Sequence, residues 1–108
     1  MPSPEEVVVV FSTFPTADKA AEVARILVEE QLVACANIVP TVRSIYRWQA
    51  AVQDDSEALA IFKTSRDRFN DLERRLVQLH PYELPEVIAL PLIAGHAPYL
   101  AWVVGSVG

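Results

Sequence analysis

Apolar and polar positions along the chain follow two periods that predict strands and helices. Residues 7–11 form a continuous run of apolar, mostly β-branched side chains, which predicts a central strand covered on both faces. In residues 17–32 apolar side chains recur every three or four positions with charged ones between them, as in an amphipathic helix. Residues 66–79 repeat this helical pattern after Ser65, a suitable N-cap.

The longest predicted element is a strand over residues 35–49. After Pro40 its side chains alternate, with Tyr46 and Trp48 on one face and Arg43 and Arg47 on the other. Fifteen extended residues would span about 50 Å, whereas a domain of this size is about 35 Å across. The strand must therefore bend, break or project, and we expect the bend at Pro40. A projecting arm would need its apolar face covered by another chain, so the length of the strand predicts an oligomer.

The rest of the chain predicts a return strand, an edge strand and a last helix. The return strand covers residues 57–64, and Asp54-Asp55-Ser56 has turn chemistry, although a tip nearer Ala50 is an alternative. Residues 86–93 read as a strand in which Pro91 requires an edge position or a bulge. Residues 99–104 predict a short helix.

This order of elements predicts one α+β domain over residues 1–108. The sequence β-α-β-β-α-β is the ferredoxin-like split βαβ arrangement, here with a long β-hairpin and a short C-terminal helix. It consists of a four-stranded antiparallel sheet with two helices on one face. The other face of the sheet has no helices, so we expect it to be polar or to be covered by partners.

Composition narrows the classes of function. The net charge of −5 argues against nucleic-acid binding, and the 52% of hydrophobic residues agrees with surface buried between subunits. A single cysteine excludes an intrachain disulfide and fits a reducing compartment. The acidic, proline-rich residues 2–6 resemble neither a signal peptide nor a membrane span. We therefore expect a cytoplasmic protein without membrane partners.

Three side chains could donate to a metal ion. Cys35 is either a small buried thiol or a soft metal donor, and as a catalytic nucleophile it would need a nearby base. His80 follows a helix, whose dipole would favour an imidazolium there, and it is either a cap or a ligand. His80 and Glu83 offer nitrogen and oxygen donors acceptable to copper or zinc. Two donors do not close a site, so further ligands would have to come from elsewhere, including a neighbouring subunit.

A small-molecule cleft is a further alternative. The aromatic residues are first expected in the core or in an interface, but Lys63 interrupts an apolar strand and could hold an anion beside them. The chain has no phosphate-binding glycine loop and no paired catalytic carboxylates, which argues against nucleotide binding of the Walker or Rossmann kind. We expect no enzymatic activity, and an enzyme that uses Cys35 is the weakest of the hypotheses.

Several segments resemble the CutA1 family of divalent-cation tolerance proteins. They are Asn-Ile-Val-Pro-Thr-Val-Arg-Ser-Ile-Tyr-Arg-Trp-Gln at residues 37–49, Phe-Lys-Thr at 62–64, His-Pro-Tyr-Glu-Leu-Pro-Glu-Val-Ile-Ala-Leu-Pro at 80–91 and Tyr-Leu-Ala-Trp at 99–102. The resemblance extends from residue 7 to residue 102. One departure is Ala50, where the family usually has glycine, so a turn with positive φ would cost about 1 kcal/mol here.

The resemblance implies a ferredoxin-like fold, a homotrimer with hairpins reaching onto neighbouring subunits, and tolerance to divalent cations, copper above all. By position, Cys35, His80 and Glu83 match places where the family offers metal donors. A similarity to PII signalling proteins implies, as an alternative, a regulatory module that binds a small anion in clefts between subunits. The residues that match this ligand cleft are Lys63, Trp48, Tyr82 and Trp102.

Overall fold

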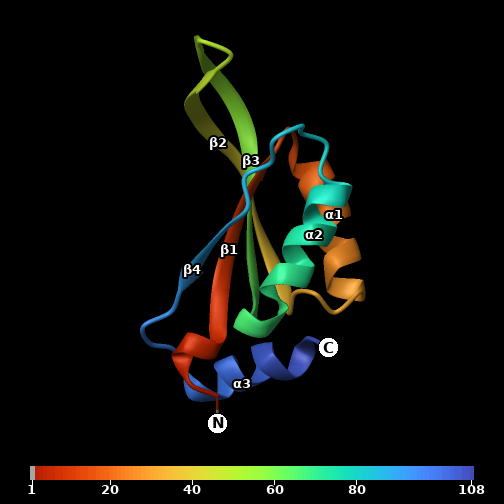
Figure 1. Ribbon diagram of the computed structural model, residues 1–108, viewed down its shortest axis with the longest axis vertical. Helices are drawn as coiled ribbons and strands as arrows, with labels where there is room; N and C mark the ends of the chain where they lie inside the picture. Colours follow the sequence, from red (N-terminus) through yellow and green to blue (C-terminus); the bar gives the residue numbers. More distant parts are fainter. Residues whose placement is uncertain (1) are drawn as a thin grey trace.

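The computed structural model describes residues 2–108 and contains one four-stranded antiparallel sheet with the strand order β2-β3-β1-β4. The elements in chain order are η1 (Pro4–Glu6), β1 (Val7–Phe14), α1 (Ala17–Glu29), β2 (Cys35–Trp48), β3 (Ala51–Ser65), η2 (Arg66–Arg68), α2 (Phe69–Leu79), β4 (Ile88–Pro91) and α3 (Ala97–Ser106). Helices α1 and α2 lie on one face of the sheet (Figure 1). The predicted ferredoxin-like arrangement is confirmed.

The main core lies between the sheet and these two helices. Val8, Val10 and Phe14 of β1 point into it and meet apolar side chains of α1 and α2 such as Leu27 and Leu72. Strand β1 therefore continues to Phe14, three residues past its predicted end, because Phe14 is fully buried in this core. The intervening Ser12 is small enough to be buried on the same face.

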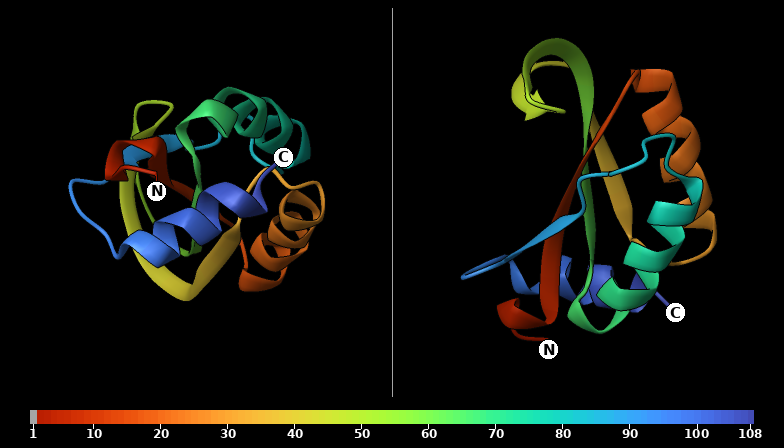
Figure 2. Two further views of the ribbon diagram at one scale, coloured as in Figure 1. Left: turned by 90° about the horizontal axis from the view of Figure 1, so that it is seen from below. Right: turned by 45° about the horizontal axis from the view of Figure 1, so that its top comes forward.

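A second, smaller core lies at one end of the sheet, on the face opposite α1 and α2. Helix α3 crosses this end of the sheet (Figures 1 and 2), and its Leu100 and Val103 pack with Val7 and Ala34. Strand β4 forms one edge of the sheet, which confirms the edge position predicted from Pro91. Within the described part of the chain, none of the helices is long and apolar enough to cross a membrane.

Strand β2 bends at a β-bulge next to Pro40, where the sequence predicted it. Val39 pairs with Leu59 whereas Val42 pairs with Glu57, so β2 carries one residue more than β3 between these two pairs. Beyond the bulge, residues 42–57 form the arm, a two-stranded hairpin that extends past the helices (Figure 1). The molecule measures 47 × 26 × 22 Å, and the arm extends along the longest of these axes (Figure 1).

The tip of the arm is a tight turn at Gln49 and Ala50. Both residues have positive φ, 49° and 65°, although neither is glycine. Of the two positions that the sequence allowed for the turn, the one near Ala50 is confirmed, whereas Asp54-Asp55-Ser56 is wrong because these residues of β3 pair with β2. Asp54 instead forms a two-pronged ion pair with Arg43 across the arm, with N–O distances of 2.7 and 2.8 Å.

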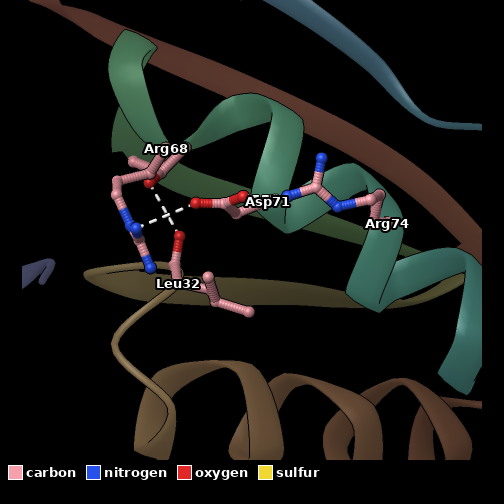
Figure 3. Close-up of polar contacts among 5 residues, drawn as sticks. Leu32, Arg68, Asp71 and Arg74 are labelled. Carbon is pink, nitrogen blue, oxygen red and sulfur yellow. Dashed lines mark hydrogen bonds and ion pairs between the residues drawn. The ribbon is translucent and has the colours of Figure 1, made fainter.

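Polar contacts fix the junction between β3 and α2 (Figure 3). The buried Thr64 hydroxyl donates to the Leu32 carbonyl at 2.7 Å, which ties the end of β3 to the loop after α1. Arg68 pairs with Asp71 at 2.9 Å, and Asp71 also accepts from Arg74. The helix predicted from residue 66 accordingly starts as the η2 turn and becomes α-helical at Phe69.

Candidate functional site

A cavity of about 640 Å³ lies between the arm and the connector that follows α2, and we call it the arm cavity. Its aromatic wall consists of Tyr46, Trp48 and Tyr82, and its acidic wall consists of Glu57, Glu83 and Glu86. The remaining lining residues are Thr13, Ser44, Ile45, Arg47 and Leu84. The arm therefore supplies one side of the cavity, and the proline-rich connector supplies the other.

His80 holds the connector against β1. The residue is only 8% exposed, and its ring stacks on Phe14 with 4.3 Å between ring centroids. Nε2 lies 2.9 Å from the Thr13 carbonyl, and the Tyr82 amide donates to Nδ1 at 3.1 Å. A carbonyl only accepts, so this network assigns the proton to Nε2 and leaves Nδ1 as the acceptor. His80 is thereby fixed as one neutral tautomer.

Burial also lowers the pKa of His80, while the bond to Thr13 and the charge of Glu57 oppose this shift. The sequence suggested an imidazolium stabilised by the end of α2. That expectation is wrong, because the ring lies inside the protein, where desolvation disfavours the charged form.

Two tyrosine hydroxyls donate to carboxylates at the cavity. Tyr82 donates to Glu57 Oε2 at 2.6 Å, and Tyr46 donates to Asp55 Oδ2 at 2.7 Å. Burial and the bond to Glu57 raise the pKa of Tyr82. The bond to Asp55, followed by burial and nearby negative charge, raises the pKa of Tyr46. Both hydroxyls are thus held as donors in a negatively charged environment.

Cys35 lies in a different place, beside α3. Its Sγ is 3.6 Å from the Tyr99 hydroxyl, a bond that raises the pKa of Tyr99. The Tyr99 ring packs against Trp102 with 5.6 Å between centroids. Lys63 is the register partner of Cys35 on β3, and its ammonium donates to Asn37 Oδ1.

The predicted ligand-cleft residues thus divide between two locations. Trp48 and Tyr82 line the arm cavity, whereas Lys63 and Trp102 lie in the neighbourhood of Cys35. Sequence reasoning did not find Glu57, although an acidic residue at the start of an otherwise apolar strand was a visible signal.

The predicted metal donors are also apart within one chain. Glu83 lines the arm cavity, His80 has both ring nitrogens in hydrogen bonds, and Cys35 contacts Tyr99. Among residues 2–108, no group of three or more His, Cys, Asp or Glu side chains is placed to hold a metal ion. A closed metal site therefore needs donors from outside the single chain or a rearrangement within it.

Comparison with known proteins gives one consistent result. Residues 8–106 match the family model described as "CutA1 divalent ion tolerance protein". The chain is 46% identical to the divalent-cation tolerance protein CutA of Thermus thermophilus over 96% of this chain and 99% of that protein. It is 43% identical to mouse protein CutA over 93% of this chain but only 56% of the mouse protein.

Solved structures agree with these sequence matches. The Cut A1 structure from Thermus thermophilus superposes with a TM-score of 0.91 at 45% identity, covering 94% of this chain and 99% of the other. Rice CutA1 superposes with a TM-score of 0.92 at 38% identity, covering 95% and 94% of the two chains. The likeness thus includes the arm as well as the sheet and helices.

Proposed function

The chain belongs to the CutA1 family of divalent ion tolerance proteins, and on this basis we propose that it is a homotrimeric metal-response protein that binds copper or another divalent metal ion. The relatives' names supply the link to divalent cations. Within this chain, the accessible thiol of Cys35 is the observation that supports the proposal of metal binding. The proposed role is non-enzymatic and takes place in a reducing compartment such as the cytoplasm, where the single cysteine stays reduced.

Exposed apolar surface supports the oligomer. On the arm, Ile45 is 65% exposed and Val52 is 67% exposed, and Ile88 and Leu90 lie open on the edge strand β4. An unpaired edge and clustered apolar side chains favour association with another chain. Light scattering after gel filtration tests this, with a mass three times that of one chain expected. A stable monomer at micromolar concentration would contradict it.

The chemistry of the donors supports metal binding at a subunit boundary. Cys35 is half-buried and offers a soft thiolate, which suits copper. His80 in its present conformation fits a metal poorly, because ligation would break one of its two hydrogen bonds. We therefore propose that Cys35 anchors the ion and that a neighbouring copy supplies further donors, Glu83 among the candidates.

Copper titration of purified variants tests this assignment. Cys35→Ser should abolish most binding, and His80→Ala measures whether the imidazole contributes. His96→Ala is a matched control, since His96 is an exposed residue at the start of α3. If Cys35→Ser binds as much copper as the parent protein, the named anchor is wrong.

A second candidate function is binding of a small anion near Lys63. Lys63 is a half-buried residue, and among the described residues its ammonium contacts an amide oxygen and forms no ion pair. A half-buried cation without a counter-ion favours an anionic ligand. A thermal-shift screen with nucleotides, carboxylates and phosphates tests it, and Lys63→Gln should remove any stabilisation found.

A further inference from the structure

We propose that the arm cavity binds an organic cation of the alkyl diammonium or polyammonium class, held by its acidic and aromatic walls. This ligand differs from the metal ion and from the anion considered above. The inference uses the geometry and charge of the arm cavity and shares only Glu83 with the metal proposal.

Glu57 provides the first argument. Its side chain is only 9% exposed and lines the cavity, and Oε2 accepts the Tyr82 hydroxyl. Within residues 2–108 Glu57 forms no ion pair. A cation close to this carboxylate would meet an opposite charge that no basic side chain in the described part of the chain already pairs. The cavity beside it is where that cation can lie.

The charges around the arm cavity also favour a cationic ligand over an anionic one. The acidic wall supplies three carboxylates, while Arg47 is the single basic side chain among the lining residues of this cavity. Tyr46 and Tyr82 already donate their hydroxyl protons to Asp55 and Glu57, so these donors are not available to an anion. An anion would therefore meet repulsion and few donors here.

Cavity size and spacing favour an organic ligand over a metal ion. Within residues 2–108 the three carboxylates of the acidic wall are not grouped closely enough for all of them to hold one metal ion. The volume of about 640 Å³ lies within the range of about 300–1,000 Å³ typical of small-molecule pockets. Ammonium groups separated by methylenes could reach separate carboxylates.

The aromatic wall completes the complementarity. Faces of tryptophan and tyrosine attract ammonium groups through their negative quadrupole. Trp48 and Tyr46 come from the arm, and Tyr82 comes from the connector, so rings approach the cavity from both sides. Leu84 adds apolar surface for a methylene chain.

Calorimetry with three five-carbon probes tests the proposal on the full chain in its native oligomeric state. The probes are 1,5-diaminopentane, 1,5-pentanediol and glutarate, which share a chain length and differ in charge. At low ionic strength we expect the diamine to bind at least tenfold more tightly than the diol, and glutarate not to bind. Binding of the diamine should change the fluorescence of Trp48. Because Trp102 also fluoresces, the Trp48→Phe variant shows how much of the signal comes from Trp48.

Charge-neutral variants locate the site. Glu57→Gln preserves the side-chain shape and an acceptor for Tyr82, and it should weaken diamine binding at least tenfold. Glu73→Gln removes one charge from the exposed surface of α2 and should leave binding within twofold. Glu83→Gln changes an exposed residue of the connector and should also weaken diamine binding. It replaces Glu57→Gln as the test if that variant fails to fold.

Three results would overturn the proposal. One is glutarate binding as tightly as the diamine, and another is equal diamine affinity in Glu73→Gln and in the acidic-wall variants. The third is an absence of diamine binding to the oligomer, which would indicate that another copy of the chain already fills the cavity.

Discussion

The turn at the tip of the arm predicts that Ala50→Gly stabilises the protein. Ala50 has φ 65°, a left-handed conformation that costs an L-residue roughly 1–2 kcal/mol and costs glycine almost nothing. Glycine also makes the unfolded chain more flexible, which takes back about 0.4–1 kcal/mol. The net gain should be about 0.5–1 kcal/mol per chain, or a rise in Tm of roughly 3–6 °C.

Urea denaturation at fixed protein concentration measures this gain, because the stability of an oligomer depends on concentration. Ala51→Gly is the matched control. Ala51 begins β3 and does not have positive φ, so glycine there should lower the free energy of unfolding by about 0.5–1 kcal/mol. Equal effects of the two substitutions, or no gain from Ala50→Gly, would refute the assignment of strain to the turn.

Three other predictions concern single side chains. Burial lowers the pKa of His80 below its ordinary 6.5. The contribution of neutral His80 to the free energy of unfolding is therefore complete above about pH 6.5 and is lost as the pH falls toward the folded-state pKa. Denaturant titrations at several pH values should show the stability difference between the parent and His80→Gln shrinking over that range. Thr64→Val keeps the shape but leaves the Leu32 carbonyl without its buried donor, and should cost about 1–3 kcal/mol in chemical denaturation. Thr16 caps α1 by accepting from the Lys19 amide at 3.1 Å, so Thr16→Ala should cost about 1 kcal/mol, and an unchanged Tm would contradict this.

The sequence pattern predicted the order of elements well because each element carries its own period. The amphipathic repeat of α1 and the alternation of β2 depend on neighbours within a few residues. The turn was harder to place. Asp54-Asp55-Ser56 has the composition of a turn, whereas Gln49 and Ala50 take a conformation that their side chains disfavour. Cross-strand pairing of Tyr46 with Gln53 and of Trp48 with Ala51 fixes the actual tip.

The candidate site was less predictable because it depends on contacts between distant residues. Trp48 and Tyr82 were expected together and do line one cavity. Glu57 became visible as a site residue only through its bond to Tyr82, which is 25 positions away. His80 was expected as a helix cap or a ligand, but the depth of its ring depends on stacking with Phe14, a residue that the sequence placed outside the strand.

The bulge at Pro40 has a consequence for how this hairpin can vary in length. Below the bulge, Cys35, Asn37 and Val39 share a face, and the additional residue transfers that face to even-numbered positions, including Tyr46 and Trp48. The bulge thus decides which side chains of the arm share a face with Cys35. Removing the additional residue at the bulge would leave Val42 paired with Glu57 and keep the aromatic side chains on their present face. Removing one residue of β2 beyond the bulge would instead turn every side chain between the deletion and the tip to the opposite face.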